Sequence, residues 1–201
     1  MKIDLHVHTS EYSGCAVSTE KEQIEAAIAR GLDGIALTDH NFQRNQAYLE
    51  QLNKEYAPFK IFAGVEIHVV DSYEDILVIG VHDMAEYNDH KWTYPELHNF
   101  VREKGGFIAI PHPYRYVDKV KADVTNFAPD ALELKSKNID PKNANLIQAL
   151  AKKLGIKTIV ASDAHVSEHL GMYHLVVHNN VQTDTDLVQE LKSGRYEHGE
   201  L

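Results

Sequence analysis

A chain of 201 residues is long enough for one domain with a substantial core, and a single α/β barrel fits within this length. The formal net charge is −10, from 20 basic and 30 acidic residues, and the basic residues are not clustered as they are in nucleic-acid-binding proteins. Stable nucleic-acid binding is therefore disfavoured, whereas binding of a small phosphorylated substrate through metal ions is not. The single cysteine excludes an internal disulfide and a cysteine-built zinc site, and we find neither a signal peptide nor an apolar stretch long enough to cross a bilayer. We therefore expect one cytoplasmic domain, residues 1–201, without a membrane anchor.

Short apolar runs predict strands, and amphipathic segments with capping residues predict helices between them. In chain order we predict a strand over 4–8, a helix from the capping box at 19–22 to Gly31, a strand over 34–37, a helix over 45–56, strands over 61–65 and 76–79, a helix over 93–104, strands over 107–110 and 131–134, a helix over 140–154, and strands over 158–161 and 174–177 before a helix over 183–192. This alternation indicates a mostly parallel sheet covered by helices on both faces.

One connection departs from that alternation. Only eight residues separate Glu66, at the end of one predicted strand, from Asp75, at the start of the next. A parallel crossover needs a dozen residues or more, so a hairpin-like return is expected here. Asp75 should then lie at the same end of the sheet as Glu66, although a solvated turn residue would also fit this position.

Histidine and carboxylate residues recur where the predicted strands end. His6 and His8 lie late in the first strand and point to one face, with Asp4 two residues earlier on the same face, which makes a half-site for a divalent metal. Five further residues follow the apolar runs of later strands, namely His40, Glu66, His112, Asp163 and His165. In α/β barrels the C-terminal ends of the strands form the active-site mouth, so we expect these residues to converge on one metal centre.

The other histidines do not share this position. We expect each of them to be a surface or hydrogen-bonded side chain: His68, His82, His90, His98, His169, His174, His178 and His198.

The ordered motifs resemble the polymerase and histidinol phosphatase (PHP) family from Met1 to about Gly194. The matching segments are Asp4-Leu5-His6-Val7-His8-Thr9, Leu37-Thr38-Asp39-His40, Gly64-Val65-Glu66, Ile110-Pro111-His112-Pro113 and Ser162-Asp163-Ala164-His165. The resemblance implies a distorted TIM-like (β/α)7 barrel of PHP type. It also implies two or three divalent metal ions at the C-terminal mouth and hydrolysis of phosphate esters.

The resemblance further implies which residues bind each metal ion. His6, His8, Glu66 and Asp163 would hold the first metal, with Glu66 as a bridge; Asp75 and His112 would complete the second, and His40 and His165 would hold the third. Glu66, His40 and Asp163 are also expected to take part in catalysis. The chain departs from the family pattern in two places, at Asp75, where many relatives have His, and at Ser13-Gly14-Cys15, where many have a ligand. Cys15 is either a soft ligand or a small buried residue, and we expect the second.

The chemistry of this ligand set favours a hydrolase that acts through a metal-activated water, with zinc, manganese and iron equally compatible. Arg115, three residues after His112, is a candidate phosphate-binding residue, although a surface arginine would also fit. The leading hypothesis is a phosphoesterase acting on a small phosphorylated metabolite or nucleotide. Two alternatives stay open, a metal-dependent amidohydrolase or lactonase and a non-catalytic metal-binding PHP module.

Overall fold

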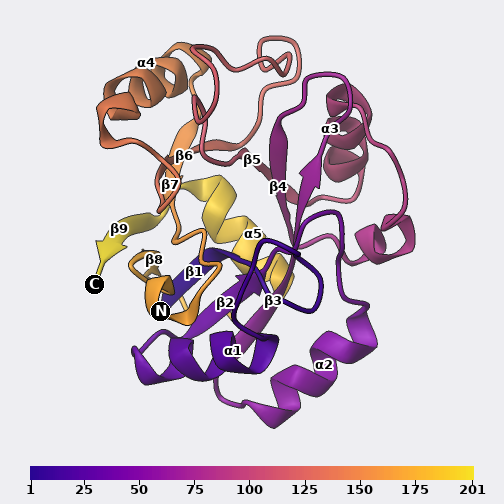
Figure 1. Cartoon of the computed structure of the whole chain (residues 1–201), viewed down its shortest axis with the longest axis vertical. Coiled ribbons are helices and arrows are strands. Elements are labelled where there is room, and N and C mark those ends of the chain that lie inside the picture. Colours follow the sequence, from indigo (N-terminus) through magenta and orange to yellow (C-terminus); the bar gives the residue numbers. More distant parts are fainter.

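A single mixed sheet of nine strands organises the chain, in the order β7-β6-β5-β4-β3-β2-β1-β8-β9. The computed structural model describes all 201 residues (Figure 1). The strands are β1 (Lys2–Val7), β2 (Gly34–Leu37), β3 (Lys60–His68), β4 (Asp75–Ile79), β5 (Phe107–Ile110), β6 (Ala131–Lys135), β7 (Lys157–Val160), β8 (Tyr173–Val177) and β9 (Tyr196–Glu200). The helices are α1 (Glu20–Ala29), α2 (Gln46–Glu55), α3 (Tyr94–Glu103), α4 (Ala144–Leu154) and α5 (Asp184–Ser193), with short 3-10 segments at η1 (His82–Tyr87), η2 (Pro141–Asn143) and η3 (Ser167–His169).

The sheet curls into a nearly closed barrel, which confirms the predicted α/β barrel class. The segment after β7 meets the end of β1, where the backbone N–H of His8 donates to the carbonyl of Ala164 at 2.9 Å and the N–H of Ala164 donates to the carbonyl of His6 at 3.2 Å. Strands β1, β2 and β3 are parallel neighbours, as are β5, β6 and β7. Their C-terminal ends therefore open toward one mouth.

The predicted hairpin return between β3 and β4 is confirmed. The two strands are antiparallel, with His68 opposite Asp75 and Glu66 opposite Leu77. Strand β3 runs two residues beyond Glu66, so Glu66 lies inside the strand and not directly after it as predicted. Asp75, at the start of β4, consequently lies at the same end of the sheet as the end of β3.

The helix boundaries follow the predicted capping signals. Capping boxes open α1 at Thr19, α3 at Thr93 and α5 at Thr183, and Gly155 ends α4 with a left-handed φ of 68°. The helix predicted over 140–154 begins instead with the 3-10 segment η2, and α4 starts only at Ala144.

Two strands extend the sheet beyond the seven expected in the barrel. Strand β8 pairs antiparallel with β1, in agreement with the strand predicted over 174–177, and β9, which was not predicted, pairs antiparallel with β8. The Tyr196 hydroxyl donates to the carbonyl of Thr158 in β7 at 3.2 Å. These two strands thus cover the gap between β1 and β7.

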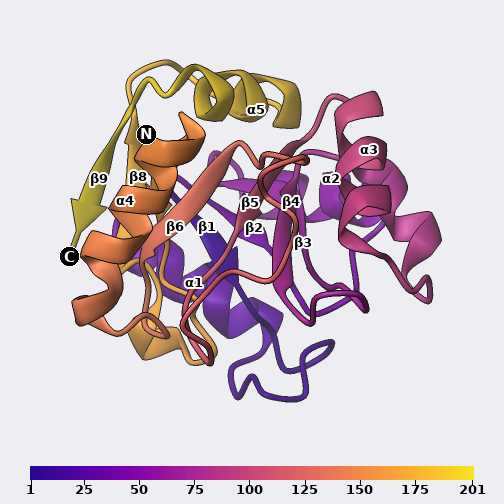
Figure 2. The same cartoon turned by 90° about the horizontal axis from the view of Figure 1, so that it is seen from above.

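Helix α5 closes the end of the barrel opposite the mouth. Leu187, Val188 and Leu191 on this helix belong to the main apolar core. Figure 2 shows α5 and the loop that follows β1 on opposite sides of the sheet. A smaller apolar cluster lies between α1, α2 and the first three strands.

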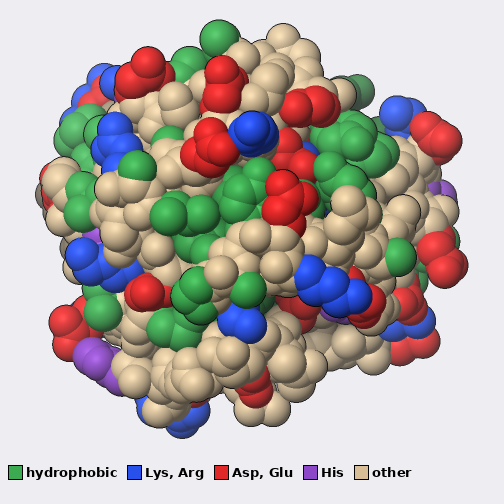
Figure 3. Space-filling view, turned by 90° about the horizontal axis from the view of Figure 1, so that it is seen from below, with side chains coloured by type: hydrophobic (Ala, Val, Ile, Leu, Met, Phe, Trp, Pro, Cys, Tyr) green, Lys and Arg blue, Asp and Glu red, His purple; other side chains and the backbone are tan.

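Charged and apolar side chains both lie on the molecular surface. On the face shown in Figure 3, acidic and basic side chains are interspersed around a central group of apolar ones. None of the helices is both long enough and apolar enough to traverse a lipid bilayer.

Candidate metal centre

Residues from distant parts of the chain meet at the barrel mouth. His6 belongs to β1 and His8 follows it, Glu66 lies in β3, and Asp163 follows β7. The Nε2 atoms of His6 and His8 lie 3.4 and 3.2 Å from Glu66 Oε2, and 3.4 and 3.3 Å from Asp163 Oδ1. All four side chains are buried. The structure thus brings these four predicted residues together, while their binding of a metal stays a prediction.

Two carboxylate oxygens in this cluster accept no hydrogen bond, although the Nε2 atoms of His6 and His8 lie close to both. Glu66 Oε2 and Asp163 Oδ1 are both buried, and a buried acceptor without a partner costs about 1–3 kcal/mol, more when it is charged. Two ligand atoms that each lie about 2.0–2.2 Å from one metal ion are about 2.8–3.6 Å apart in tetrahedral or octahedral geometry. The contacts of these oxygens with His6 and His8 fall within that interval. The donor set therefore fits a divalent cation.

Glu66 also contacts a second group of candidate ligands. His112 Nε2 lies 2.9 Å from Glu66 Oε1, and His40 Nδ1 lies 3.1 Å from Glu66 Oε2. Asp75 Oδ2 lies 4.0 Å from His112 Nε2, and Asp75 forms a possible ligand group with His40 and Glu66. Both oxygens of Glu66 thus face imidazoles on different sides, the arrangement expected of a bridging carboxylate. The predicted place of Asp75 at this mouth is confirmed, while ligation by it stays a prediction.

A third group combines His8, His40 and His165, whose nearest ring nitrogens lie within 4.8 Å of one another. The His165 Nδ1 lies 3.1 Å from the carbonyl of Asp163 and can donate to it, which directs its Nε2 away from that backbone. His40 and His165 are half-buried, so this group forms the solvent-facing side of the centre. Cys15, expected to be a small buried residue, is exposed and belongs to none of the possible ligand groups.

The carboxylates and imidazoles shift one another's pKa values in opposite directions. Burial alone would lower the pKa of His6, but attraction to Asp163 and Glu66 raises it well above its ordinary value. Burial alone would raise the pKa of Glu66, but attraction to His6 and the hydrogen bond with His112 hold it well below the usual range. The pKa of Asp163 is likewise lowered, against burial, by His6 and His8. The carboxylates are therefore ionised, as metal ligands must be.

Two candidate ligands lie on strained backbone. The φ angles of His112 and Asp163 are 30° and 54°, in the left-handed region that residues with a side chain seldom adopt. Such conformations cost about 1–3 kcal/mol and cluster at functional sites. The segments that follow β5 and β7 thus carry backbone strain at the two residues whose side chains point into the mouth.

Several supporting residues were not identified from the sequence. Ser13 Oγ donates to Asp39 Oδ1 at 2.6 Å and lies 3.2 Å from His8 Nδ1, so it accepts from that ring and holds Nε2 toward the cluster. Asn138 Nδ2 donates to Asp163 Oδ2 at 2.6 Å, which leaves Oδ1 for the imidazoles. A buried carboxylate on β6, Glu133, contacts His6 and His112.

Asp4 does not take the role suggested by its place on the strand face. Its carboxylate accepts from the backbone N–H groups of Ser162 and Gly171, at 3.0 and 2.9 Å. It fastens the segment that carries Asp163 to β1 and forms no part of the ligand groups. The hydrogen bonds of its two oxygens are structural.

Arg115 lies beside the metal centre on its open side. It lines a small hollow of about 50 Å³ together with Asp75 and His112, and its guanidinium lies 4.9 Å from the ring centroid of Tyr116. The side chain is exposed and makes no ion pair within the protein. Its place is compatible with phosphate binding, which stays a prediction.

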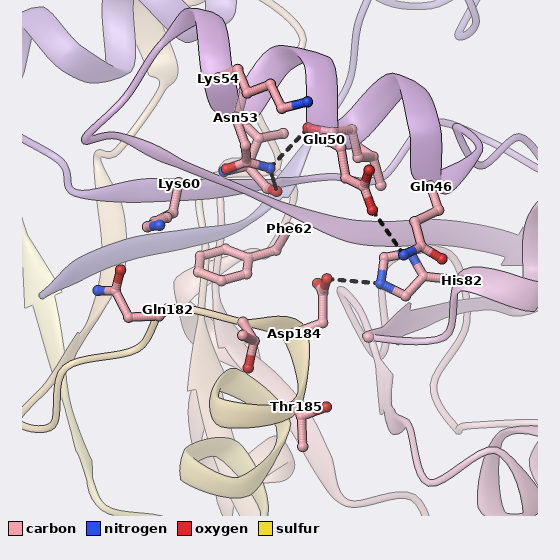
Figure 4. Close-up of a pocket in the computed structure, with 14 residues that line it drawn as sticks. Gln46, Glu50, Asn53, Lys54, Lys60, Phe62, His82, Gln182, Asp184 and Thr185 are labelled. Carbon is pink, nitrogen blue, oxygen red and sulfur yellow. Dashed lines mark hydrogen bonds and ion pairs between the residues drawn. The ribbon is translucent and has the colours of Figure 1, made fainter.

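A wider hollow of about 490 Å³ lies at the other end of the barrel, near Lys60 at the start of β3 (Figure 4). His82 Nε2 lies 3.0 Å from Asp184 Oδ2, and Gln46 Nε2 donates to Glu50 Oε1 at 2.9 Å. Because these polar groups pair with one another and lie away from the mouth, we assign this hollow no ligand.

Comparisons with known proteins show what the chain and its fold are similar to. The chain is 26% identical over 226 aligned positions to a protein named "Probable phosphatase Teth514_1060" from Thermoanaerobacter sp. (strain X514), covering 96% of this chain and 91% of that protein. A crystal structure from Bacteroides vulgatus, of a two-domain protein containing a predicted PHP-like metal-dependent phosphoesterase, has a TM-score of 0.76 at 14% identity, over 100% of this chain and 64% of that one. An amidohydrolase from Chromobacterium violaceum has a TM-score of 0.68 at 16% identity and 98% coverage of both chains.

The two solved structures share only the fold at this level of identity, so their names do not decide between the activities. The family model decides the membership. The PHP domain model matches residues 4–200, nearly the whole chain. The protein therefore belongs to the PHP domain family.

Proposed function

We propose that the protein is a metal-dependent phosphoesterase that hydrolyses a phosphate ester of a small metabolite or nucleotide. The observation that carries this proposal is the buried pair of partnerless oxygens, Glu66 Oε2 and Asp163 Oδ1, each facing both His6 and His8. The named phosphatase relative from Thermoanaerobacter supports the same activity.

The candidate ligands divide into three sets around Glu66. His6, His8, Glu66 and Asp163 would hold the first cation, Glu66, Asp75 and His112 the second, and His40 and His165 a third. When bound, such divalent ions, zinc, manganese or iron, activate a water and neutralise charge on the attacked phosphoryl group. The protein contributes the anionic charge that retains the ions and the geometry that fixes their spacing.

Other side chains would act on the substrate and on protons. Arg115, at the open edge of the site, would bind a non-bridging phosphate oxygen through its planar guanidinium. The side chain of His40 is 32% exposed, so His40 can contact a substrate seated in the mouth. Burial lowers the pKa of His40, which keeps this ring neutral near pH 7 and able to ligate or accept a proton.

Turnover of p-nitrophenyl phosphate with added Mn²⁺, together with elemental analysis of protein purified without chelator, tests the proposal. We expect at least two equivalents of metal and hydrolysis that a chelator abolishes. Metal without hydrolysis of any phosphate ester in a metabolite and nucleotide panel would support a non-catalytic module. Hydrolysis of amides or lactones alone would support the amidohydrolase alternative.

The variant Glu66→Gln tests the role of the bridge. It removes one negative charge while keeping the size of the side chain, so both metal affinity and turnover should fall. Glu190→Gln is a matched control. Glu190 is also buried, but it lies on α5, at the end of the barrel opposite the mouth, and it pairs with Asn179 and Arg195. Full metal and full activity in Glu66→Gln would refute the two-metal mechanism.

A further inference from the structure

Glu133 on β6 is a fully buried carboxylate next to the metal centre, yet it belongs to none of the possible ligand groups. Both of its oxygens are engaged by other residues. Oε1 lies 3.0 Å from His6 Nδ1, and Oε2 accepts from the backbone N–H of His112 at 2.8 Å. One side chain thus contacts two candidate ligands, His6 on β1 and His112 in the segment that follows β5.

We propose that Glu133 is the positioning residue of the metal centre, which sets the tautomer of His6 and holds the backbone of His112. This inference rests on the proposed metal site. An ionised carboxylate can only accept hydrogen bonds, so the nitrogen that faces it, Nδ1 of His6, carries the ring proton. In the neutral ring that binds a metal, the lone pair is then on Nε2, the atom directed at Glu66 and Asp163.

The contact with His112 acts on the backbone. His112 has a φ of 30° and stands between Pro111 and Pro113, neither of which has an N–H to donate. The N–H of His112 therefore provides the only backbone donor of this three-residue segment, and Glu133 accepts from it. Holding that strained backbone keeps His112 Nε2 within 2.9 Å of Glu66 Oε1.

The number of acceptors makes glutamine a sharp test. Glu133 presents two acceptor oxygens to two N–H donors, and a glutamine of the same size presents one oxygen and one NH2 group. In Glu133→Gln the NH2 group faces either the backbone N–H of His112, which then loses its acceptor, or Nδ1 of His6, which can accept only if its proton moves to Nε2; in both cases one of the two positioning effects is lost without a cavity. Loss of an outer partner of this kind lowers metal affinity by roughly 10- to 100-fold.

Zinc affinity measured by competition with a chromophoric chelator is the first readout. We expect Glu133→Gln to bind Zn²⁺ roughly 10- to 100-fold more weakly than the wild type, whereas Glu190→Gln should match the wild type. Thermal unfolding of the metal-free proteins controls for a general loss of stability. Wild-type zinc affinity in folded Glu133→Gln would overturn the inference.

The tautomer of His6 is the second readout, because an ionised Glu133 can accept a hydrogen bond from His6 only if Nδ1 carries the ring proton. In ¹⁵N-labelled, zinc-loaded wild-type protein, long-range ¹H–¹⁵N spectra should show the His6 proton on Nδ1, assigned with a His6→Asn variant. A proton on Nε2 would overturn the inference even if no Glu133 variant folds. Wild-type protein that binds no metal would instead refute the proposed function, so the two failures are distinguishable.

Discussion

Replacing Asp75 with alanine separates ligation from surface stabilisation. The Oδ1 atom of Asp75 lies 2.8 Å from His68 Nδ1, while Oδ2 faces the metal centre 4.0 Å from His112 Nε2. The His68 side chain is 45% exposed and that of Asp75 is 18% exposed, so their pair contributes only about 0.2–1 kcal/mol to the free energy of unfolding. For a domain of this length, 1 kcal/mol corresponds to about 2–4 °C in Tm. The metal-free Asp75→Ala protein should therefore unfold within a few degrees of the wild type.

The effect on metal content should be much larger than this effect on stability. Asp75 is grouped with His40 and Glu66, and removing its carboxylate would leave the proposed second cation without one of its anionic ligands. We expect elemental analysis after desalting to show about one equivalent less metal in Asp75→Ala than in the wild type.

His68→Ala is the matched control for this experiment. It breaks the same hydrogen bond but keeps the carboxylate, so it should retain the full equivalent and weaken binding by about 10-fold or less. Unchanged metal content in Asp75→Ala would show that Asp75 is a turn residue bound to His68 and would refute the reasoning.

Three further results are expected. Arg115→Ala should keep its metal but lose on the order of 1.5–3 kcal/mol of transition-state binding, roughly 10- to 150-fold in kcat/KM, and a wild-type kcat/KM would remove Arg115 from the site. Because the pKa values of His6 and His8 are raised in the metal-free fold, their protonated forms stabilise it below about pH 6.5, and this contribution is lost as pH rises through the raised pKa values. Since metal binding needs neutral imidazoles, the rise in Tm caused by Mn²⁺ should grow from about pH 6 to about pH 8, and an equal rise at both pH values would contradict this. Cys15→Ser should leave metal content and activity unchanged, and loss of one equivalent would make Cys15 a ligand after all.

The candidate ligands could be predicted from the sequence because, in an α/β barrel, residues at the C-terminal ends of successive strands lie close together in space. His6, His112 and Asp163 lie far apart in the chain, but each stands at or next to the C-terminal end of a strand. Parallel strands with helical crossovers bring all such ends to one mouth. The short return from Glu66 to Asp75 was predictable for a related reason, because chain length alone excluded a crossover.

Other features have weaker sequence signals. Strand β9 is a polar edge strand, Tyr-Glu-His-Gly-Glu, with no apolar alternation, and it forms because β8 offers it a partner. Cys15 was expected to be buried from its residue type alone, but the loop after β1 is held by Ser13 and Asp39, which leaves Cys15 on the outside. Loop burial depends on which residues fasten the loop, and that is a tertiary property.

Glu133 shows most clearly what local reasoning misses. It lies between two leucines in a buried strand, and a lone carboxylate in such a run is itself a signal, since burying it without partners costs several kcal/mol. Its partners cannot be read locally, because His6 is 127 residues away in sequence. The same holds for His8, whose ring is fixed by Ser13 and through it by Asp39. The candidate ligands can be predicted from their positions at strand ends. The direction in which each imidazole presents its lone pair depends instead on contacts such as those of Glu133 and Ser13. Metal affinity should therefore respond to residues that never touch the ion.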